Sequence, residues 1–154
     1  MGRVRPQAPE GFQTSRAIMR AVSQEDVETL RGLFDRWGRG DFTTREAFDP
    51  EVEFARVGTE VVGGPGRWRG ADEMWRVVVD WLRDWEEVRF EAEEFLDLGD
   101  RVLVLVRQIG RGTRSGLPLE TEQADLFTLR DGKIVQWESY WNRAEAMRAT
   151  GLED

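Results

Sequence analysis

The sequence predicts an α+β domain, because patterns typical of helices fill its first half and patterns typical of strands fill its second half. Apolar residues recur at helical spacing between Val27 and Trp37 and again between Met74 and Trp85. From Val88 onward, apolar and polar residues alternate in segments separated by glycines, as in an antiparallel meander. A chain of 154 residues fits one domain. We therefore expect helices packed on one face of a bent sheet.

The first long helix is expected to begin at Ser23, because residues 23–26 (Ser-Gln-Glu-Asp) resemble a capping box. Gly38 and Gly40 end this helix. Residues 1–22 are predicted to be an N-terminal extension containing a short helix over 15–21, and residues 23–150 are predicted to form the domain.

Local patterns predict the other elements. The alternation slips near Glu93 and Glu94, which predicts a β-bulge. Residues 58–70 are rich in glycine and predict a long loop. The remaining expectations are short helices over 43–48 and 143–149, a long helix over 71–85, and strands over 52–56, 88–99, 102–109, 117–129 and 134–141.

Two absent residue types limit the chemistry of the chain. Without cysteine it has no disulfide, thiolate nucleophile or zinc–thiolate site. Without histidine it lacks Ser-His-Asp and Cys-His machinery and any histidine-bound metal. The acidic residues between Glu86 and Asp97 lie on a predicted strand, whose alternation sends them to opposite faces. We expect no cofactor and no metal, and acid–base chemistry is left mainly to carboxyl groups.

Charge and hydropathy exclude several partners. The net charge of −8 works against binding of nucleic acid or an anionic membrane. The longest strongly apolar run, residues 102–106, is too short to span a membrane. No apolar segment follows the arginines at positions 3 and 5, so a secretory signal is not expected. We expect a cytoplasmic protein that binds neither nucleic acid nor membrane.

The last predicted hairpin, residues 120–141, decides which side chains face the core. Its turn at residues 130–132 (Arg-Asp-Gly) permits two registers. A two-residue turn pairs Asp125 with Glu138, whereas a three-residue turn with a left-handed glycine pairs Asp125 with Trp137. One residue of slip moves every side chain to the other face. We favour the three-residue turn, since the alternative buries Glu138 and turns two tryptophans toward water.

The inner face of this hairpin is then aromatic and holds three polar groups. A carboxyl in such surroundings should lose hydration and have a raised pKa, so Asp125 is the candidate catalytic acid or base. Gln108, Gln123 and Ser139 can orient a ligand carbonyl or a water, although each can equally satisfy buried neighbours. The apolar part of the candidate ligand site consists of Phe54, Phe127, Trp137 and Trp141.

Other aromatic and basic residues have simpler explanations. Trp75, Trp81 and Trp85 lie at helical spacing and are expected in the core. Arg56 and Arg107 can hold an anionic ligand, but surface ion pairs explain them more simply.

Four motifs carry a family resemblance: Glu122-Gln123-Ala124-Asp125, residues 129–134 (LRDGKI), residues 137–141 (WESYW), and Arg69-Gly70 before the second long helix. The chain resembles the NTF2-like superfamily, particularly the SnoaL-like branch that includes polyketide cyclases, over about residues 23–150. The resemblance implies a cone in which a strongly curved antiparallel sheet wraps around the N-terminal helices and encloses an apolar pocket. Because many domains of this fold form dimers, it also implies a homodimer.

The resemblance also bears on catalytic residues. Asp125 falls where steroid isomerases of this fold place an oxyanion-stabilising aspartic acid, and where SnoaL-type cyclases place a histidine. The cyclases' catalytic aspartate falls at Ser139, the isomerases' base at Phe54 and their tyrosine near Leu33. Epoxide hydrolases of this fold need an Asp-Arg-Asp set that Ser139 interrupts, and dehydratases of the histidine type are excluded.

The sequence thus predicts a SnoaL-like domain that binds a small apolar, cyclic molecule, with proton transfer through Asp125 as the candidate reaction. Isomerisation, cyclisation, and addition or removal of water all fit. Two alternatives stay open: non-catalytic binding in the same pocket, and dimerisation through the outer face of the sheet.

Overall fold

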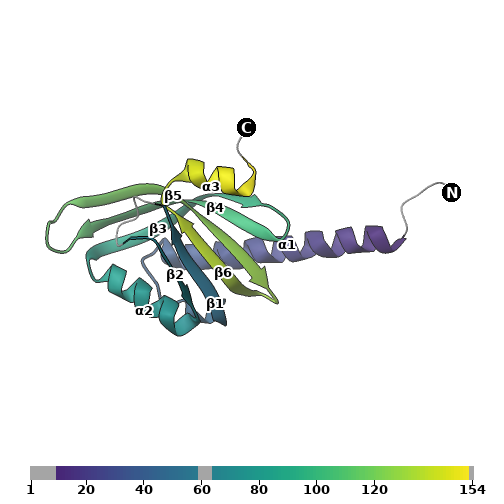
Figure 1. Ribbon diagram of the computed structural model, residues 1–154, viewed down its shortest axis with the longest axis horizontal. Helices are drawn as coiled ribbons and strands as arrows, with labels where there is room; N and C mark the ends of the chain where they lie inside the picture. The colour runs from purple at the N-terminus through teal and green to yellow at the C-terminus, as the bar shows by residue number, and fades with distance from the viewer. Residues whose placement is uncertain (1–9, 59–63, 153–154) are drawn as a thin grey trace.

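The computed structural model describes residues 10–58 and 64–152, and of residues 10–23 it describes only the helical backbone. This part of the chain forms three α-helices and one six-stranded sheet, an α+β arrangement as predicted (Figure 1). The elements are α1 (Glu10–Trp37), a 3-10 turn (Arg45–Ala47), β1 (Phe48–Val57), β2 (Gly66–Arg69), α2 (Ala71–Leu82), β3 (Trp85–Asp97), β4 (Arg101–Gly112), β5 (Pro118–Arg130), β6 (Lys133–Tyr140) and α3 (Arg143–Thr150).

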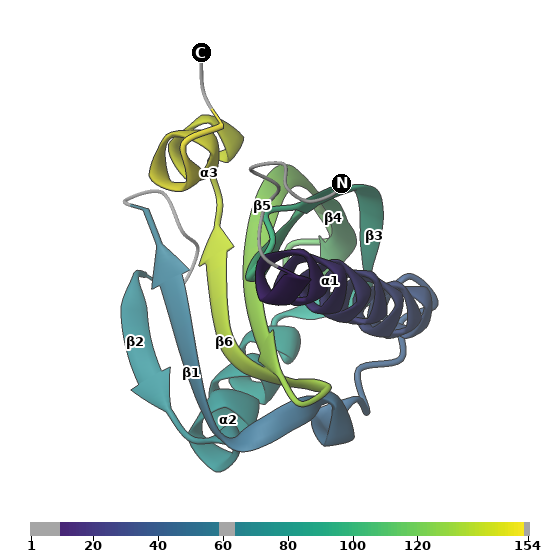
Figure 2. The same ribbon diagram turned by 90° about the vertical axis from the view of Figure 1, so that its right-hand side faces the viewer.

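The sheet has the strand order β2-β1-β6-β5-β4-β3. The pairing of β1 with β6 is parallel, and the other neighbours are antiparallel. Figure 2 shows the sheet curving around α1. Helices α1 and α2 contribute to the main core on the concave side, whereas α3 packs on β5 and β6 over a second, smaller core. In residues 10–58 and 64–152, no helix is both long and apolar enough to cross a membrane.

Helix α1 begins at Glu10, so the prediction that it starts at Ser23 is wrong. No glycine or proline occurs between Phe12 and Arg31. Propagating an existing helix costs little, whereas a new start at Ser23 would leave free amides that need capping. The helix therefore continues through the capping motif, and the short helix predicted over 15–21 is part of α1. The domain boundary at residue 23 stays a prediction.

Other boundaries differ by short stretches. The predicted helix over 43–48 is only a three-residue 3-10 turn, and the predicted loop over 58–70 contains strand β2. Helix α2 ends at Leu82 rather than at Trp85, which begins β3. The bulge expected in β3 is confirmed between Ala92 and Glu94. Gly151, with φ of 76°, ends α3 as a left-handed cap.

The hairpin between β5 and β6 has a different turn from the one that we favoured. Its two turn residues, Asp131 and Gly132, have φ of 53° and 77°, and two positive φ values match the twist of the flanking strands. An extra residue of β6, Val135, then shifts the register. Asp125 therefore pairs with Ser139, not with Trp137. The two-residue turn alone would have reversed the two faces of β6, and the extra residue at Val135 reverses them again. The predicted inner and outer faces are therefore correct, although the predicted turn is wrong.

The main core is centred on aromatic side chains. Trp37 of α1 lies 5.4 Å from Phe90 and 5.3 Å from Trp137 between ring centroids. Its indole Nε1 donates a 2.9 Å hydrogen bond to Thr44 Oγ1. A buried indole N–H needs such a partner. Phe90 and Trp137 of this cluster also face a cavity that α2 borders.

Candidate functional site

A small cavity of about 40 Å³ lies on the inner face of the sheet, under α2. Strands β1, β3, β4, β5 and β6 all contribute to its wall, and α2 contributes from above. The lining side chains are Phe54, Arg56, Val78, Trp81, Phe90, Gln108, Gln123, Trp137, Ser139 and Trp141. Six of the predicted site residues therefore come together here: Phe54, Gln108, Gln123, Trp137, Ser139 and Trp141.

Asp125 and Phe127, the other two predicted residues, lie behind this lining and are fully buried. Strand β5 runs between β4 and β6, so that Asp125 sits between Val104 and Ser139 in the sheet. Its inward side chain has no access to solvent in this conformation. The binding and catalytic roles of all eight residues remain predictions.

Burial raises the pKa of Asp125 from 3.8 to about 6. Loss of hydration disfavours the charged carboxylate, and the nearby side chains of Ser139, Trp137 and Gln123 only partly oppose this effect. Gln123 Nε2 lies 3.5 Å from Asp125 Oδ2, at the long limit of a hydrogen bond. The carboxyl can thus be protonated or ionised near neutral pH.

Several polar atoms around the cavity lack partners. Among the described residues, no hydrogen bond reaches Asp125 Oδ1, Trp137 Nε1, or one amide atom each of Gln108 and Gln123. The Trp137 indole lies near the carboxyl without meeting it at bonding geometry. Buried polar groups are normally paired, and each unpaired group costs about 1–3 kcal/mol. Four such atoms around one cavity indicate a site that water or a ligand completes.

Trp137 forms the floor of the cavity. Its ring lies 4.4 Å from Phe54 and stacks at 5.9 Å on Phe127. Trp81 and Trp141, by contrast, are only partly buried and border the cavity on its outer side. Trp75, Trp81 and Trp85 pack against the main core, although each stays partly exposed.

Four lining residues were not among the predicted ligand-binding residues: Arg56, Val78, Trp81 and Phe90. Arg56 was recognised in the sequence as able to hold an anionic ligand, but the surface ion pair expected for it does not occur among the residues with described side chains. Strand alternation could also have found Phe90, which lies two residues after the buried Val88. Val78 and Trp81 required the position of α2 over the sheet, which no local pattern gives.

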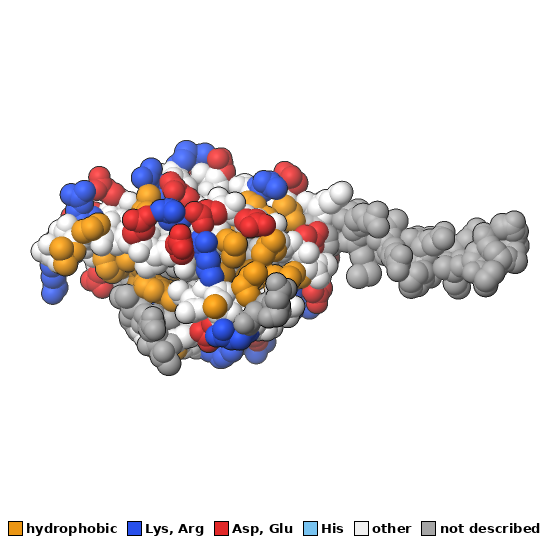
Figure 3. All heavy atoms as spheres, turned by 90° about the horizontal axis from the view of Figure 1, so that it is seen from above, with side chains coloured by type: hydrophobic (Ala, Val, Ile, Leu, Met, Phe, Trp, Pro, Cys, Tyr) orange, Lys and Arg blue, Asp and Glu red, His pale blue; other side chains and the backbone are white. Residues whose placement is uncertain are grey.

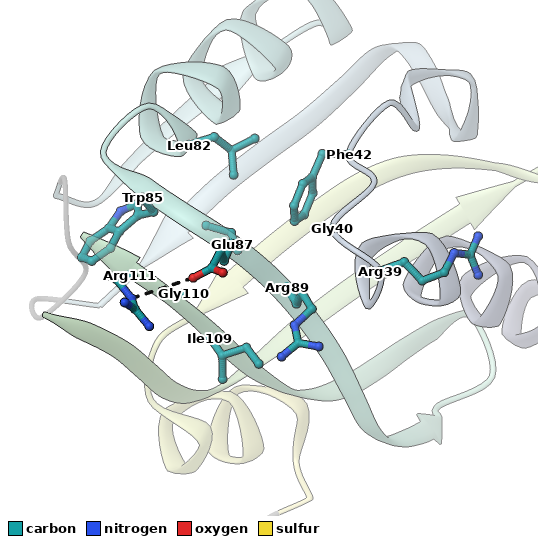
Figure 4. A pocket seen from close by; sticks show the side chains of 11 residues that line it. Arg39, Gly40, Phe42, Leu82, Trp85, Glu87, Arg89, Ile109, Gly110 and Arg111 are labelled. Atoms are coloured by element: carbon teal, nitrogen blue, oxygen red, sulfur yellow. Dashed lines mark ion pairs between the residues drawn. The ribbon is translucent and has the colours of Figure 1, made fainter. Parts of the chain in front are cut away.

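A larger, open hollow of about 770 Å³ lies at the edge strand β3 (Figure 4). Its lining includes Phe42, Trp85, Arg89 and the ion pair between Glu87 and Arg111, 3.8 Å apart. None of the predicted site residues contributes to it. Its ionisable side chains are exposed to solvent, which weakens their interactions. The cavity beside Asp125 is the stronger candidate site.

The charged residues of the outer sheet face form a surface network. Arg107 contacts Glu93, Glu120 and Glu122, as expected for a surface ion pair rather than a ligand clamp. Among the residues with described side chains, no group of acidic residues is arranged to hold a metal ion.

Residues 16–137 of the sequence match the family model of the SnoaL-like domain. The chain belongs to the SnoaL-like domain family. The match covers most of the chain and confirms the resemblance to the NTF2-like superfamily that the sequence motifs suggested. No curated protein matches this SnoaL-like domain in sequence.

Solved structures show the same fold. An NTF2-like protein of unknown function from Burkholderia pseudomallei K96243 is 21% identical with a TM-score of 0.67, covering 80% of this chain and 95% of that one. A protein from Jannaschia sp. CCS1, classed with SnoaL-like polyketide cyclases, is 19% identical with a TM-score of 0.66, covering 85% and 94%. TerC, co-crystallised with polyporic acid, is 18% identical with a TM-score of 0.63, covering 82% and 98%. Such similarity establishes the cone-shaped fold.

Proposed function

We propose that this SnoaL-like domain binds a small, mostly apolar and cyclic molecule in the cavity beside Asp125 and transfers a proton on it through that carboxyl. The observation that carries the proposal is a fully buried carboxyl directly behind the wall of an aromatic cavity, with unpaired polar atoms on Gln108, Gln123 and Trp137 in that wall. Buried groups with strongly perturbed pKa values concentrate at functional sites. TerC, a protein of the same fold, was crystallised with a small molecule, which supports small-molecule binding here.

The chemistry follows from the pKa of about 6. A carboxyl with this pKa is mostly ionised at pH 7 and is still readily protonated, which suits a group that both takes and returns a proton. Asp125 would remove a proton from a carbon next to a carbonyl and return it to another carbon, so that the product is an isomer of the substrate. Amide and indole N–H groups of Gln108 and Trp137 would donate hydrogen bonds to the carbonyl oxygen while negative charge develops on it.

Entry of a ligand requires side-chain movement. A cavity of about 40 Å³ holds only one or two water molecules, whereas ligand pockets commonly measure roughly 300–1,000 Å³. Trp81 and Trp141 are large, partly exposed side chains that border the cavity, so their rotation would open it.

The small volume also favours a second candidate, a domain of the same fold that binds without catalysis. The two candidates differ in whether Asp125 changes the rate of proton exchange. We would measure by NMR the exchange of deuterium from D2O into a panel of small cyclic ketones. Faster exchange with wild type than with Asp125→Asn supports the enzyme. Equal rates, together with ligand-induced shifts of the tryptophan indole signals, support non-catalytic binding. Asp131→Asn, in the exposed hairpin turn, is the matched control.

A homodimer and a cytoplasmic location belong to the same proposal. The absence of cysteine favours a reducing compartment. On the face that carries α3, apolar side chains form small groups between acidic residues and arginines (Figure 3). Leu117 is the one large apolar side chain with high exposure among those described, so a dimer would need a mixed apolar and polar interface. Light scattering coupled to size-exclusion chromatography would show the dimer, and a monomer at micromolar concentration would contradict it.

A further inference from the structure

Arg56 brings a positive charge to the cavity beside Asp125. It lies on β1, where it pairs with Ser139 of β6 and with Gly66 of β2. It lines the same cavity as Ser139 and Gln123. A cation at this position is unexpected in a cavity whose other lining is aromatic or uncharged.

Neighbouring residues hold the Arg56 guanidinium in place. Arg56 Cζ lies 5.6 Å from the centroid of the Trp68 ring, within the range of a cation–π interaction. Trp68 in turn stacks on Phe54 at 5.6 Å. A Cβ atom at Gly66 would lie 2.6 Å from the Trp68 ring, so only glycine leaves room for the indole to lie in this position. The sequence therefore builds an aromatic platform beneath the guanidinium.

Within the part of the chain that the structure describes, Arg56 also lacks the carboxylate partner that comparable arginines have. Among the described arginines, five are partly buried. Four of these five have an acidic side chain within 4.0 Å, namely Arg36, Arg101, Arg107 and Arg143. Arg56 has none among the residues with described side chains, and its burial lowers its pKa. A partly desolvated cation without a counter-ion is costly, and a bound anion would remove that cost.

We propose that Arg56 binds a carboxylate of the ligand, so that the molecule entering this cavity is a small organic acid. The inference rests on the proposed function and narrows its ligand class. A guanidinium matches a carboxylate through two parallel N–H···O hydrogen bonds, and its stacking on Trp68 leaves the N–H edge free to form them. With its carboxylate at Arg56 and Ser139, the apolar body of the ligand would lie against Trp137 and Trp81, next to Asp125.

The test compares acids with neutral molecules of the same shape. Benzoate and benzamide form one pair, and the smaller crotonate and crotonamide form another. Binding to the full chain is followed by NMR, from the Arg56 Nε–Hε signal and the tryptophan indole signals. We expect wild type to bind each acid at least tenfold more tightly than its amide. Arg56→Gln should bring the ratio of the two affinities close to one. Arg56→Lys keeps the charge but cannot form two parallel hydrogen bonds to a carboxylate, so it should give an intermediate ratio.

The control is Arg114→Gln, which removes an exposed arginine outside the cavity and should leave the ratio unchanged. A preference for acids that survives Arg56→Gln, or equal binding of acid and amide by wild type, overturns the inference but leaves small-molecule binding intact. If wild type binds neither member of either pair, the inference fails, whereas the proposed function fails only if the cyclic ketones also show neither exchange nor binding. If acid binding depends on Arg56 while Asp125→Asn leaves proton exchange unchanged, the inference stands and only the catalytic part of the proposed function fails.

Discussion

Replacing Asp125 with asparagine should make the domain more stable at neutral pH. Asparagine has nearly the shape of aspartic acid and cannot ionise, so the variant avoids placing a charge at a site with no solvent access. The amide can still pair with Gln123, whose side chain already approaches the carboxyl. Most point substitutions destabilise a protein, so a gain in stability would be specific to this environment.

The magnitude follows from the shift in pKa. The pKa of Asp125 rises from 3.8 to about 6 on folding, and each unit of pKa corresponds to about 1.4 kcal/mol. Because the folded state holds the proton more tightly, its contribution to stability is fully present below pH 3.8 and is lost as the pH rises through 6. Wild type should therefore lose about 2 kcal/mol from this group between pH 4 and pH 7.5, and the variant should not.

Urea unfolding at a series of pH values measures this difference. The free energies of unfolding of wild type and Asp125→Asn should be similar near pH 4 and diverge through pH 6, with the variant more stable above it. Asp131→Asn removes the same charge from an exposed turn and should stay within about 0.5 kcal/mol of wild type throughout. A difference between wild type and Asp125→Asn that does not change with pH would refute the reasoning.

Three further predictions concern packing and the hairpin. Trp141→Ala should enlarge the cavity of about 40 Å³ and increase the fluorescence of the apolar dye anilinonaphthalene sulfonate, and unchanged dye fluorescence would argue against its position at the rim. Trp137→Ala should cost about 3–5 kcal/mol of unfolding free energy, measured in urea, because it removes a central core ring, whereas a loss below about 1 kcal/mol would contradict the packing. Gly132→Ala should cost about 1–2 kcal/mol, since the φ of 77° at this position strains any residue with a Cβ atom, and a neutral effect would contradict the turn.

The fold could be predicted from the sequence because its hydrophobic patterns are strong. Strand alternation placed Asp125 and Phe127 on the inner face together with Trp137 and Ser139, and the structure has them there. The decisive argument was the cost of exposing tryptophan and burying Glu138. This cost depends only on which face of the sheet each side chain of β6 occupies. That argument is insensitive to the type of turn, and so the faces were correct although the predicted turn was wrong.

Features that depend on several elements at once could not be predicted. The extra residue at Val135 appears only in the pairing of β6 with β5, and no local pattern marks it. The continuity of α1 through Ser23 reflects the low cost of extending a helix, which outweighs a local capping motif. The small size of the cavity, and the lack of an acidic partner for Arg56 among the residues with described side chains, depend on how α2, Trp68 and β6 pack together.

The bulge at Val135 separates the tip of the hairpin from the wall of the cavity. Because the bulge determines which side chains of β6 point inward, a change in the length of the tip at residues 130–133 need not turn Trp137 and Ser139 outward. The tip is exposed in the structure. It is therefore a suitable place to insert a cysteine for a fluorescent label, which in a chain without other cysteines would mark a single site without disturbing the residues that line the cavity.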